Sequence, residues 1–333
     1  SLSILSFSRN LLWKSEVFET AGMNLSSRQQ TAEMINRCNA GDAMVGNTLF
    51  SLAAMQVLSF DDGEHDEFIR QTLHRLSLHE VGHTLGFSHN MHASTMLTVD
   101  ELKDPEVVAV NGMCNSVMEY PAINFALNPE DQTLYYDDSP GPYDYWVIEY
   151  GYSVGLEDKE AEEERLEAIL SKSTSPLLQF GNDADDMRGA GRGINPDVNI
   201  YDLSSDPVAY ASERCELVNV LLQGFVDKYS NTGSTFHDVR QAYLTLTGEY
   251  AIQLRVMTRQ IGGVRYDRAG TDNIGDGKPY TPVSLEDQKK ALAALSKYAF
   301  APDAFDAAED SYAYLQAQRR GRGHYGSGEA PRI

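Results

Sequence analysis

The sequence predicts a mainly α-helical fold with a small or partial β component, which places it in the α+β class. Apolar residues recur at three- and four-residue spacing through most of the chain, as they do in helices that bury one face. The segment typical of a strand is short and lies at residues 2–7. With 333 residues, the chain is long enough to bury a substantial core in one or two domains.

Two helices are predicted in the first part of the chain. The first covers residues 27–59, where the spaced apolar residues are Met34, Ile35, Met44, Leu49, Leu52 and Met55. The second runs on from residue 69 and has two apolar stripes, formed by Ile69, Leu73 and Leu76 and by Leu78, Val81 and Leu85. A helix that is apolar on two sides is expected to lie buried within a domain.

A boundary is predicted near residue 140, because residues 135–143 are rich in Tyr, Asp and Pro. Residues 1–140 form the first region in this interpretation, and residues 141–318 form a helical C-terminal region that packs on it. Residues 319–333 are rich in Gly and Arg and are predicted to be a disordered tail.

The C-terminal region contains several helical patterns. Residues 157–171 combine charged residues with a narrow apolar edge. Two further patterns follow, one with Leu217, Leu221, Phe225 and Tyr229 at four-residue spacing and one with Val239, Tyr243, Tyr250, Leu254 and Met257, ended by Gly262 and Gly263. Ser284 and Asp287 have the spacing of a capping box before a last helix.

The charge of the chain excludes some classes of partner. Acidic residues outnumber basic residues 49 to 27, which gives a net charge of −22. Such a field repels nucleic acid and anionic membranes, so neither is an expected partner. No apolar run approaches the ~20 residues that a membrane-spanning helix needs.

The acidic surplus has two interpretations. The first is solubility in an extracellular or saline setting, which we prefer. The second is binding of a cation or of basic peptides, with Asp183, Asp185 and Asp186 as Ca²⁺ ligands. The spacing of an EF-hand is missing, so a solvated acidic loop is the favoured alternative.

Three cysteines, Cys38, Cys114 and Cys215, allow at most one disulfide within the chain, so this is not a disulfide scaffold. Cys38 and Cys114 flank the most informative motif. They either pair or remain buried free thiols.

That motif has the form H-E-x-x-H-x-x-G-x-x-H. Residues four apart lie on one face of a helix, so His79 and His83 can bind one metal ion. Glu80 lies one position round the helix, where it can reach a water on the metal. Gly86 lets the backbone leave the helix with a positive φ, and His89 then becomes the third ligand. Three histidines leave one coordination position open, which is the pattern of a catalytic zinc site.

Other histidines are weaker candidates. His74, His92 and His237 could support the site or contact substrate, but a single histidine is more often structural. His92 could compete as a ligand because it lies three residues after His89; the motif favours His89.

The motif is followed by Met118, 29 residues after His89, in the sequence SVMEYP. Together these two elements resemble the metzincin clan of zinc endopeptidases, in which a methionine turn lies beneath the metal. The resemblance implies that Met118 forms an apolar floor without binding zinc. It also implies that Tyr120 lies beside the metal, binds it in the resting state and hydrogen-bonds the oxyanion during reaction.

A closer resemblance is to a family of large bacterial zinc-dependent metalloproteases. It covers the chain from about Met23 onward and is clearest at residues 79–94, 116–126, 141–151 and 181–187. The residue after the third histidine is Asn90, which differs from the better-known metzincins, so their substrate preferences do not transfer.

These resemblances imply a zinc endopeptidase with one catalytic Zn²⁺, Glu80 as general base and a peptide or protein substrate, secreted or periplasmic. The alternatives are a catalytically silent zinc-bearing scaffold and a zinc amidase that acts on non-protein amides. Only 78 residues precede His79 and no leader is present, so we also expect a further N-terminal portion of the same gene product.

Overall fold

The computed structural model describes residues 40–182, 194–230, 233–271 and 278–315. Within them the protein is mainly α-helical with one two-stranded sheet, which confirms the predicted fold class. The predicted strand at residues 2–7, Cys38, the aspartates at 183–186 and the tail at 319–333 lie outside these ranges.

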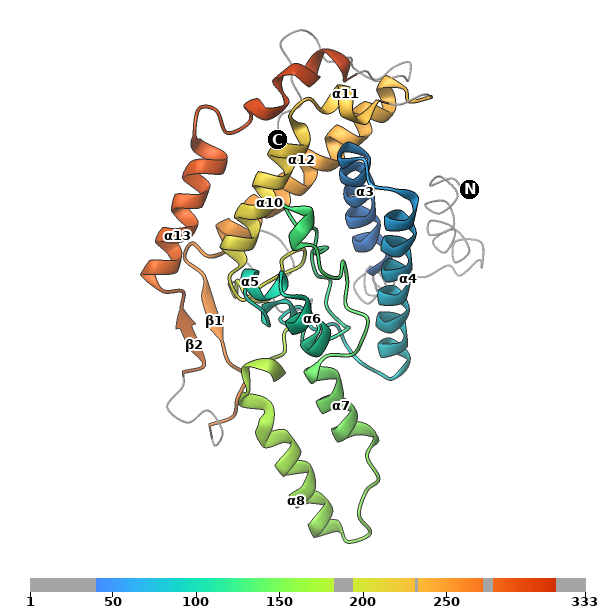
Figure 1. Ribbon diagram of the computed structural model, residues 1–333. Coiled ribbons are helices and arrows are strands. Elements are labelled where there is room, and N and C mark those ends of the chain that lie inside the picture. The colour runs from blue at the N-terminus through green and yellow to red at the C-terminus, as the bar shows by residue number, and fades with distance from the viewer. Residues whose placement is uncertain (1–39, 183–193, 231–232, 272–277, 316–333) are drawn as a thin grey trace, which may run out of the picture.

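Ten α-helices lie in the described ranges (Figure 1). They are α3 (Ala40–Leu58), α4 (Asp62–Thr84), α5 (Val99–Leu102), α6 (Pro105–Asn111), α7 (Pro142–Tyr152), α8 (Lys159–Leu170), α10 (Pro207–Leu222), α11 (Phe225–Tyr229), α12 (Phe236–Arg259) and α13 (Leu285–Leu295). Short 3₁₀ turns lie at Ala93–Thr95, Pro129–Asp131, Ser171–Thr174, Pro176–Leu178 and Asp306–Tyr314, and a π turn at Ser296–Phe300.

The sheet pairs β1 (Val264–Tyr266) with β2 (Tyr280–Pro282) in antiparallel register, with Arg265 opposite Thr281. It lies in the C-terminal part of the chain, where no strand was predicted.

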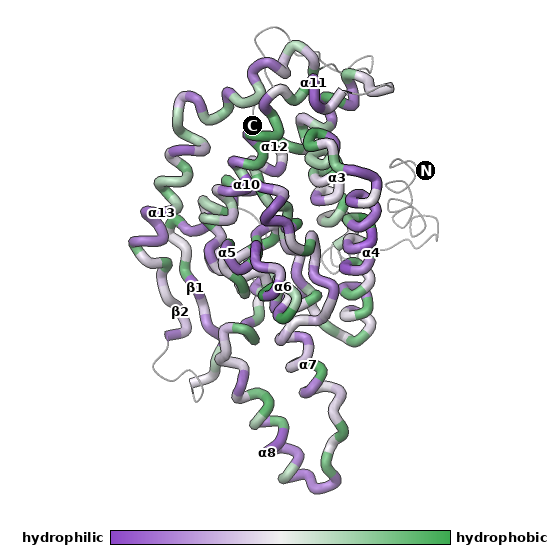
Figure 2. Tube along the Cα trace, in the orientation of Figure 1, coloured by the Kyte–Doolittle hydropathy of each residue, from purple (hydrophilic) through white to green (hydrophobic). Residues whose placement is uncertain are grey.

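The main core lies where α3, α10 and α12 pack together. Its fully buried side chains include Phe50, Leu217, Leu246 and Tyr250. Figure 2 shows that α3 is mostly hydrophobic along its length, whereas the N-terminal half of α4 beside it is mostly hydrophilic. Helix α4 therefore packs on the core by one side only.

This one-sided packing overturns the predicted burial of α4 on two faces. Leu73, Val81 and Leu85 are 43%, 53% and 36% exposed, while the buried side carries Phe68, Arg75, His79 and other residues. The interpretation failed because helical spacing alone does not say which stripe has a partner.

Capping residues define the ends of the main helices. Asp61 begins α4 through a capping box with Glu64, and Thr235 begins α12 through one with Asp238. Ser284 caps α13 by accepting from Asp287 N, as its spacing predicted. The single helix expected through residues 217–229 is wrong, because Gly224 adopts φ 63° and separates α10 from α11.

Helices α7 and α8 form a hairpin that projects from one end of the molecule (Figure 1). Trp146 joins the two helices, since its Nε1 donates to Ile169 O at 2.8 Å. The first residues of α7 are buried against the segment that follows α6.

Three irregular segments, at residues 89–94, 117–124 and 198–205, lie side by side beneath the C-terminal half of α4. Backbone hydrogen bonds join them: Asn90 N to Met118 O at 3.1 Å, Tyr201 N to Tyr120 O at 3.0 Å and Ser204 N to Ser94 O at 2.9 Å. Residues far downstream thus support the segments on which the predicted site residues lie. The boundary at residue 140 stays a prediction.

Candidate metal centre

Three histidines converge at the C-terminal end of α4. His79 and His83 lie one turn apart on the helix, and their ring centroids are 4.8 Å apart. Gly86 has the expected positive φ, 86°, and the chain reverses so that His89 faces the other two rings. The potential ligand atoms of the three residues all lie within 4.8 Å of one another.

Hydrogen bonds to backbone carbonyls orient two of these rings. His79 Nδ1 lies 2.7 Å from Val117 O, and His83 Nδ1 lies 3.0 Å from Phe87 O. A carbonyl oxygen only accepts, so each Nδ1 must carry the proton that it donates. Nε2 is then the unprotonated nitrogen of both rings, the one that can coordinate a metal ion, as in the ordered ligand sets of zinc proteins.

The spacing of the rings fits a zinc ion. His83 Nε2 and His89 Nε2 are 3.1 Å apart. Two nitrogens bound at about 2.0–2.1 Å to a tetrahedral zinc ion lie roughly 3.3 Å from each other. The imidazole donors and their separation thus suit the metal that the motif predicts.

Burial keeps His79 in the form that binds metal. Burial, reinforced by the positive charge of Arg75, lowers the pKa of His79 to about 3, against its ordinary value of 6.5. The ring is therefore neutral at physiological pH, and a neutral imidazole is the form that coordinates zinc.

Glu80 and Tyr120 differ in burial. Glu80 is exposed on α4 directly after His79. Tyr120 is buried, and its Oη lies 2.9 Å from His89 Nε2. A hydroxyl thus reaches the cluster from the chain segment that follows Met118, where the resemblance implied it.

Met118 is fully buried and packs against α4. The contact is so close that a Cβ at Gly82 would lie 2.3 Å from Met118 Sδ. Gly82 falls at a variable position of the motif, so sequence reasoning missed it. The only signal was a small residue on the helix face that bears the ligands.

Buried polar side chains surround the turn that contains Met118. Arg75 Nη2 donates to Glu119 O at 3.1 Å, and the Glu119 carboxylate accepts from Ser94 N at 3.1 Å. Burial raises the pKa of Glu119 well above its usual range and that of Asp202 to about 7. These residues were also missed, because they share no spacing with the motif.

The remaining predicted histidines are not part of the cluster. His74 is exposed and bonds Asp138 O through Nε2 at 2.9 Å. His92 is partly buried and contacts Thr95, while His237 lies near Gln241 on α12. Cys114 and Cys215 are buried free thiols, and the alternative pairing of Cys114 involves Cys38, outside the described ranges.

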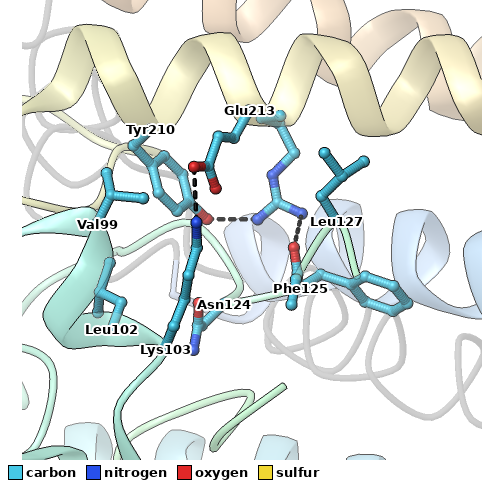
Figure 3. Close-up of a pocket in the computed structure, with 10 residues that line it drawn as sticks. Val99, Leu102, Lys103, Asn124, Phe125, Leu127, Tyr210 and Glu213 are labelled. Carbon is cyan, nitrogen blue, oxygen red and sulfur yellow. Dashed lines mark hydrogen bonds and ion pairs between the residues drawn. The ribbon is translucent and has the colours of Figure 1, made fainter. Parts of the chain in front are cut away.

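A separate small pocket lies between α5, α10 and residues 124–127 (Figure 3). Its charged side chains are already paired: Lys103 bonds Glu213 at 2.7 Å, and Arg214 bonds Tyr210 and Phe125 O. It shares no residue with the histidine cluster, so the cluster remains the candidate site.

The three-histidine site has the ligand set of a metzincin-type zinc metallopeptidase. The sequence profile of the Met-zincin family matches residues 61–327, and the chain belongs to this family. No curated protein and no solved structure matches the chain. Among the described residues, no helix has the length and apolar character needed to span a bilayer.

Proposed function

We propose that the protein is a zinc-dependent endopeptidase and that His79, His83 and His89 hold its catalytic ion. The observation that supports this most strongly is the convergence of three imidazoles, two of them oriented by backbone carbonyls, on a helix where an exposed glutamate directly follows the first ligand. Gly86 supports the site by turning the chain, and Met118 by packing beneath α4. Zinc held by three histidines would lower the pKa of a bound water to about 7 and polarise a carbonyl.

Glu80 and Tyr120 supply the remaining catalytic functions. Glu80 takes the proton of the attacking water as general base and delivers it to the leaving amine nitrogen. Tyr120 Oη donates a hydrogen bond to the carbonyl oxygen as negative charge develops there. A binding protein has no use for Glu80, which argues against a silent scaffold. Action outside the cytoplasm stays a prediction from the acidic composition.

The test is cleavage of unfolded protein and of a peptide library by three forms of the protein: zinc-loaded, chelator-stripped and reloaded. We expect cleavage to be lost with the metal and restored by zinc. Glu80→Gln should bind zinc like the parent and lose nearly all turnover, whereas Tyr120→Phe should slow turnover by about 100–1,000-fold.

The outcomes separate the alternatives. Zinc binding without cleavage of any peptide bond favours the scaffold, and release of ammonia or an amine from non-protein amides favours the amidase. Turnover of Glu80→Gln at the parental rate contradicts the mechanism.

A further inference from the structure

We propose that both ends of helix α7 hold segments of the zinc site in place. Asp144, near the start of the helix, and Tyr152, at its end, are the positioning residues. The proposal rests on the proposed function for its metal, but not on peptide cleavage. Neither residue touches the three histidines. Each instead holds the backbone of a segment that orients or carries a ligand.

The N-terminal end of α7 is hydrogen-bonded to the turn that contains Met118. Asp144 is 3% exposed, and its Oδ1 accepts from Ser116 Oγ at 2.6 Å. Its Oδ2 accepts from Val117 N and Gly141 N, each at 2.8 Å. One buried carboxylate thus accepts three hydrogen bonds, two of them from adjacent residues of the turn.

A single residue, Val117, links Asp144 to the metal ligand His79. Val117 donates its N–H to Asp144, and its carbonyl oxygen accepts from His79 Nδ1 at 2.7 Å. The orientation of the His79 ring therefore depends on where Asp144 holds this residue. Outer partners of this kind commonly tune metal affinity.

Direct backbone contact makes this end rigid. Tyr143 N donates to Asn115 O at 2.9 Å. A Cβ at Gly141 would lie 2.2 Å from Asn115 O, so only glycine permits the approach. Helix α7 is therefore fixed against the turn by backbone atoms as well as by Asp144.

The C-terminal end of α7 reaches the other side of the site. Tyr152 Oη donates to Leu85 O at 2.8 Å. Leu85 follows the last residue of α4 and lies between His83 and the turn at Gly86. Because Tyr152 is 58% exposed, water competes for this bond, and its contribution should be smaller than that of Asp144.

The experiment compares Asp144→Asn, Tyr152→Phe and a matched control, Tyr145→Phe, in the full chain. Tyr145 lies on the same helix, is 63% exposed, and its hydroxyl makes none of these hydrogen bonds. The measurements are the zinc dissociation constant by chelator competition, the absorption spectrum of the Co²⁺ form, kcat and KM separately, and Tm of the metal-free protein.

An asparagine accepts on one side-chain oxygen only and presents an NH₂ group to the other donors. Asp144→Asn should therefore weaken zinc binding by about 10–100-fold, change the Co²⁺ spectrum and lower kcat more than it raises KM. Tyr152→Phe should weaken zinc binding by less than about 10-fold. Tyr145→Phe should match the parent in all four measurements.

Parental zinc affinity and an unchanged Co²⁺ spectrum in Asp144→Asn would overturn the proposal. If that variant does not fold, Ser116→Ala removes one of the three bonds and must itself weaken zinc binding. If the zinc-loaded parent cleaves nothing, the proposed endopeptidase function is refuted. The differences in zinc affinity between the variants still test the positioning role of α7.

Discussion

The helical core and the floor of the zinc site are equally buried but are held by different interactions. Where α3, α10 and α12 meet, the contacts are between apolar side chains such as Leu246 and Tyr250. The floor, at residues 113–120, is instead held by Arg75, Asp144 and backbone hydrogen bonds.

The apolar core therefore mainly determines the stability of the fold, whereas the polar floor mainly determines the geometry of the zinc site. Apolar burial is non-directional and supplies most of the folding energy. A buried hydrogen bond adds little net stability but is costly to break, and it fixes atoms in a defined geometry. We therefore expect substitutions in the core to change stability and substitutions at the floor to change metal binding.

The largest effect should come from His83→Ala. Removing a ligand should weaken zinc binding well beyond the roughly 10–100-fold that outer partners contribute. His83 is only partly buried, so the stability of the metal-free protein should change little. Zinc titration and thermal unfolding of both metal-free proteins check this, and a large loss of metal-free stability would contradict the separation.

The reverse result is expected for Leu246→Ala in the core. Leu246 is fully buried on α12, and truncation of such a side chain costs about 2–5 kcal/mol of unfolding free energy. The zinc dissociation constant should equal that of the parent under conditions where both proteins are folded. Denaturant unfolding and zinc titration test the two halves separately, and a weakened zinc site would show that core and floor are coupled.

The helices were largely predictable, because their apolar spacing and caps are local signals. The last helix begins after Ser284 as expected, and residues 157–171 contain α8. The prediction failed where the outcome depended on more than local spacing: Leu73 and Val81 remain exposed, and the positive φ of Gly224 ended a continuous helical pattern.

The candidate site divides in the same way. His79, His83 and His89 were predictable from their spacing, and Tyr120 from a resemblance. Asp144 was not, because it acts across 27 residues of sequence through contacts that only the fold creates.

A smaller effect on stability should follow from Gly82→Ala, which adds a methyl group where α4 contacts the floor. The added Cβ would lie 2.3 Å from Met118 Sδ, and overpacking of this kind costs about 1–3 kcal/mol. Alanine also favours a helix over glycine by about 1 kcal/mol, which offsets part of this cost.

The matched control is Gly46→Ala on α3, where a Cβ would meet nothing within 4 Å. That substitution should stabilise the protein by about 0.4–1 kcal/mol, so the two alanines should differ in sign. The comparison is made by denaturant unfolding together with zinc titration. Equal stabilisation by both would mean that Met118 moves aside without cost.

The last prediction concerns pH and Asp202, a buried neighbour of the floor. Burial raises its pKa to about 7, although the Ser94 hydroxyl and the charge of Arg259 oppose the shift. Between its ordinary pKa of 3.8 and 7, the folded protein keeps a proton that the unfolded chain releases. The stability from this group is therefore complete at low pH and is lost as the pH rises through 7.

Replacement by asparagine removes this titration and keeps an oxygen for the Ser94 hydroxyl. From pH 5 to pH 8 the parent should lose up to about 2–3 kcal/mol more stability than Asp202→Asn, measured by denaturant unfolding at each pH. Leu246→Ala should keep the parental pH slope, because the stability it loses comes from apolar burial and does not depend on pH. If instead Asp202→Asn keeps the parental pH slope, another buried group governs the pH response of the floor. Glu119 is the first candidate, because it is also a buried carboxyl group with a raised pKa.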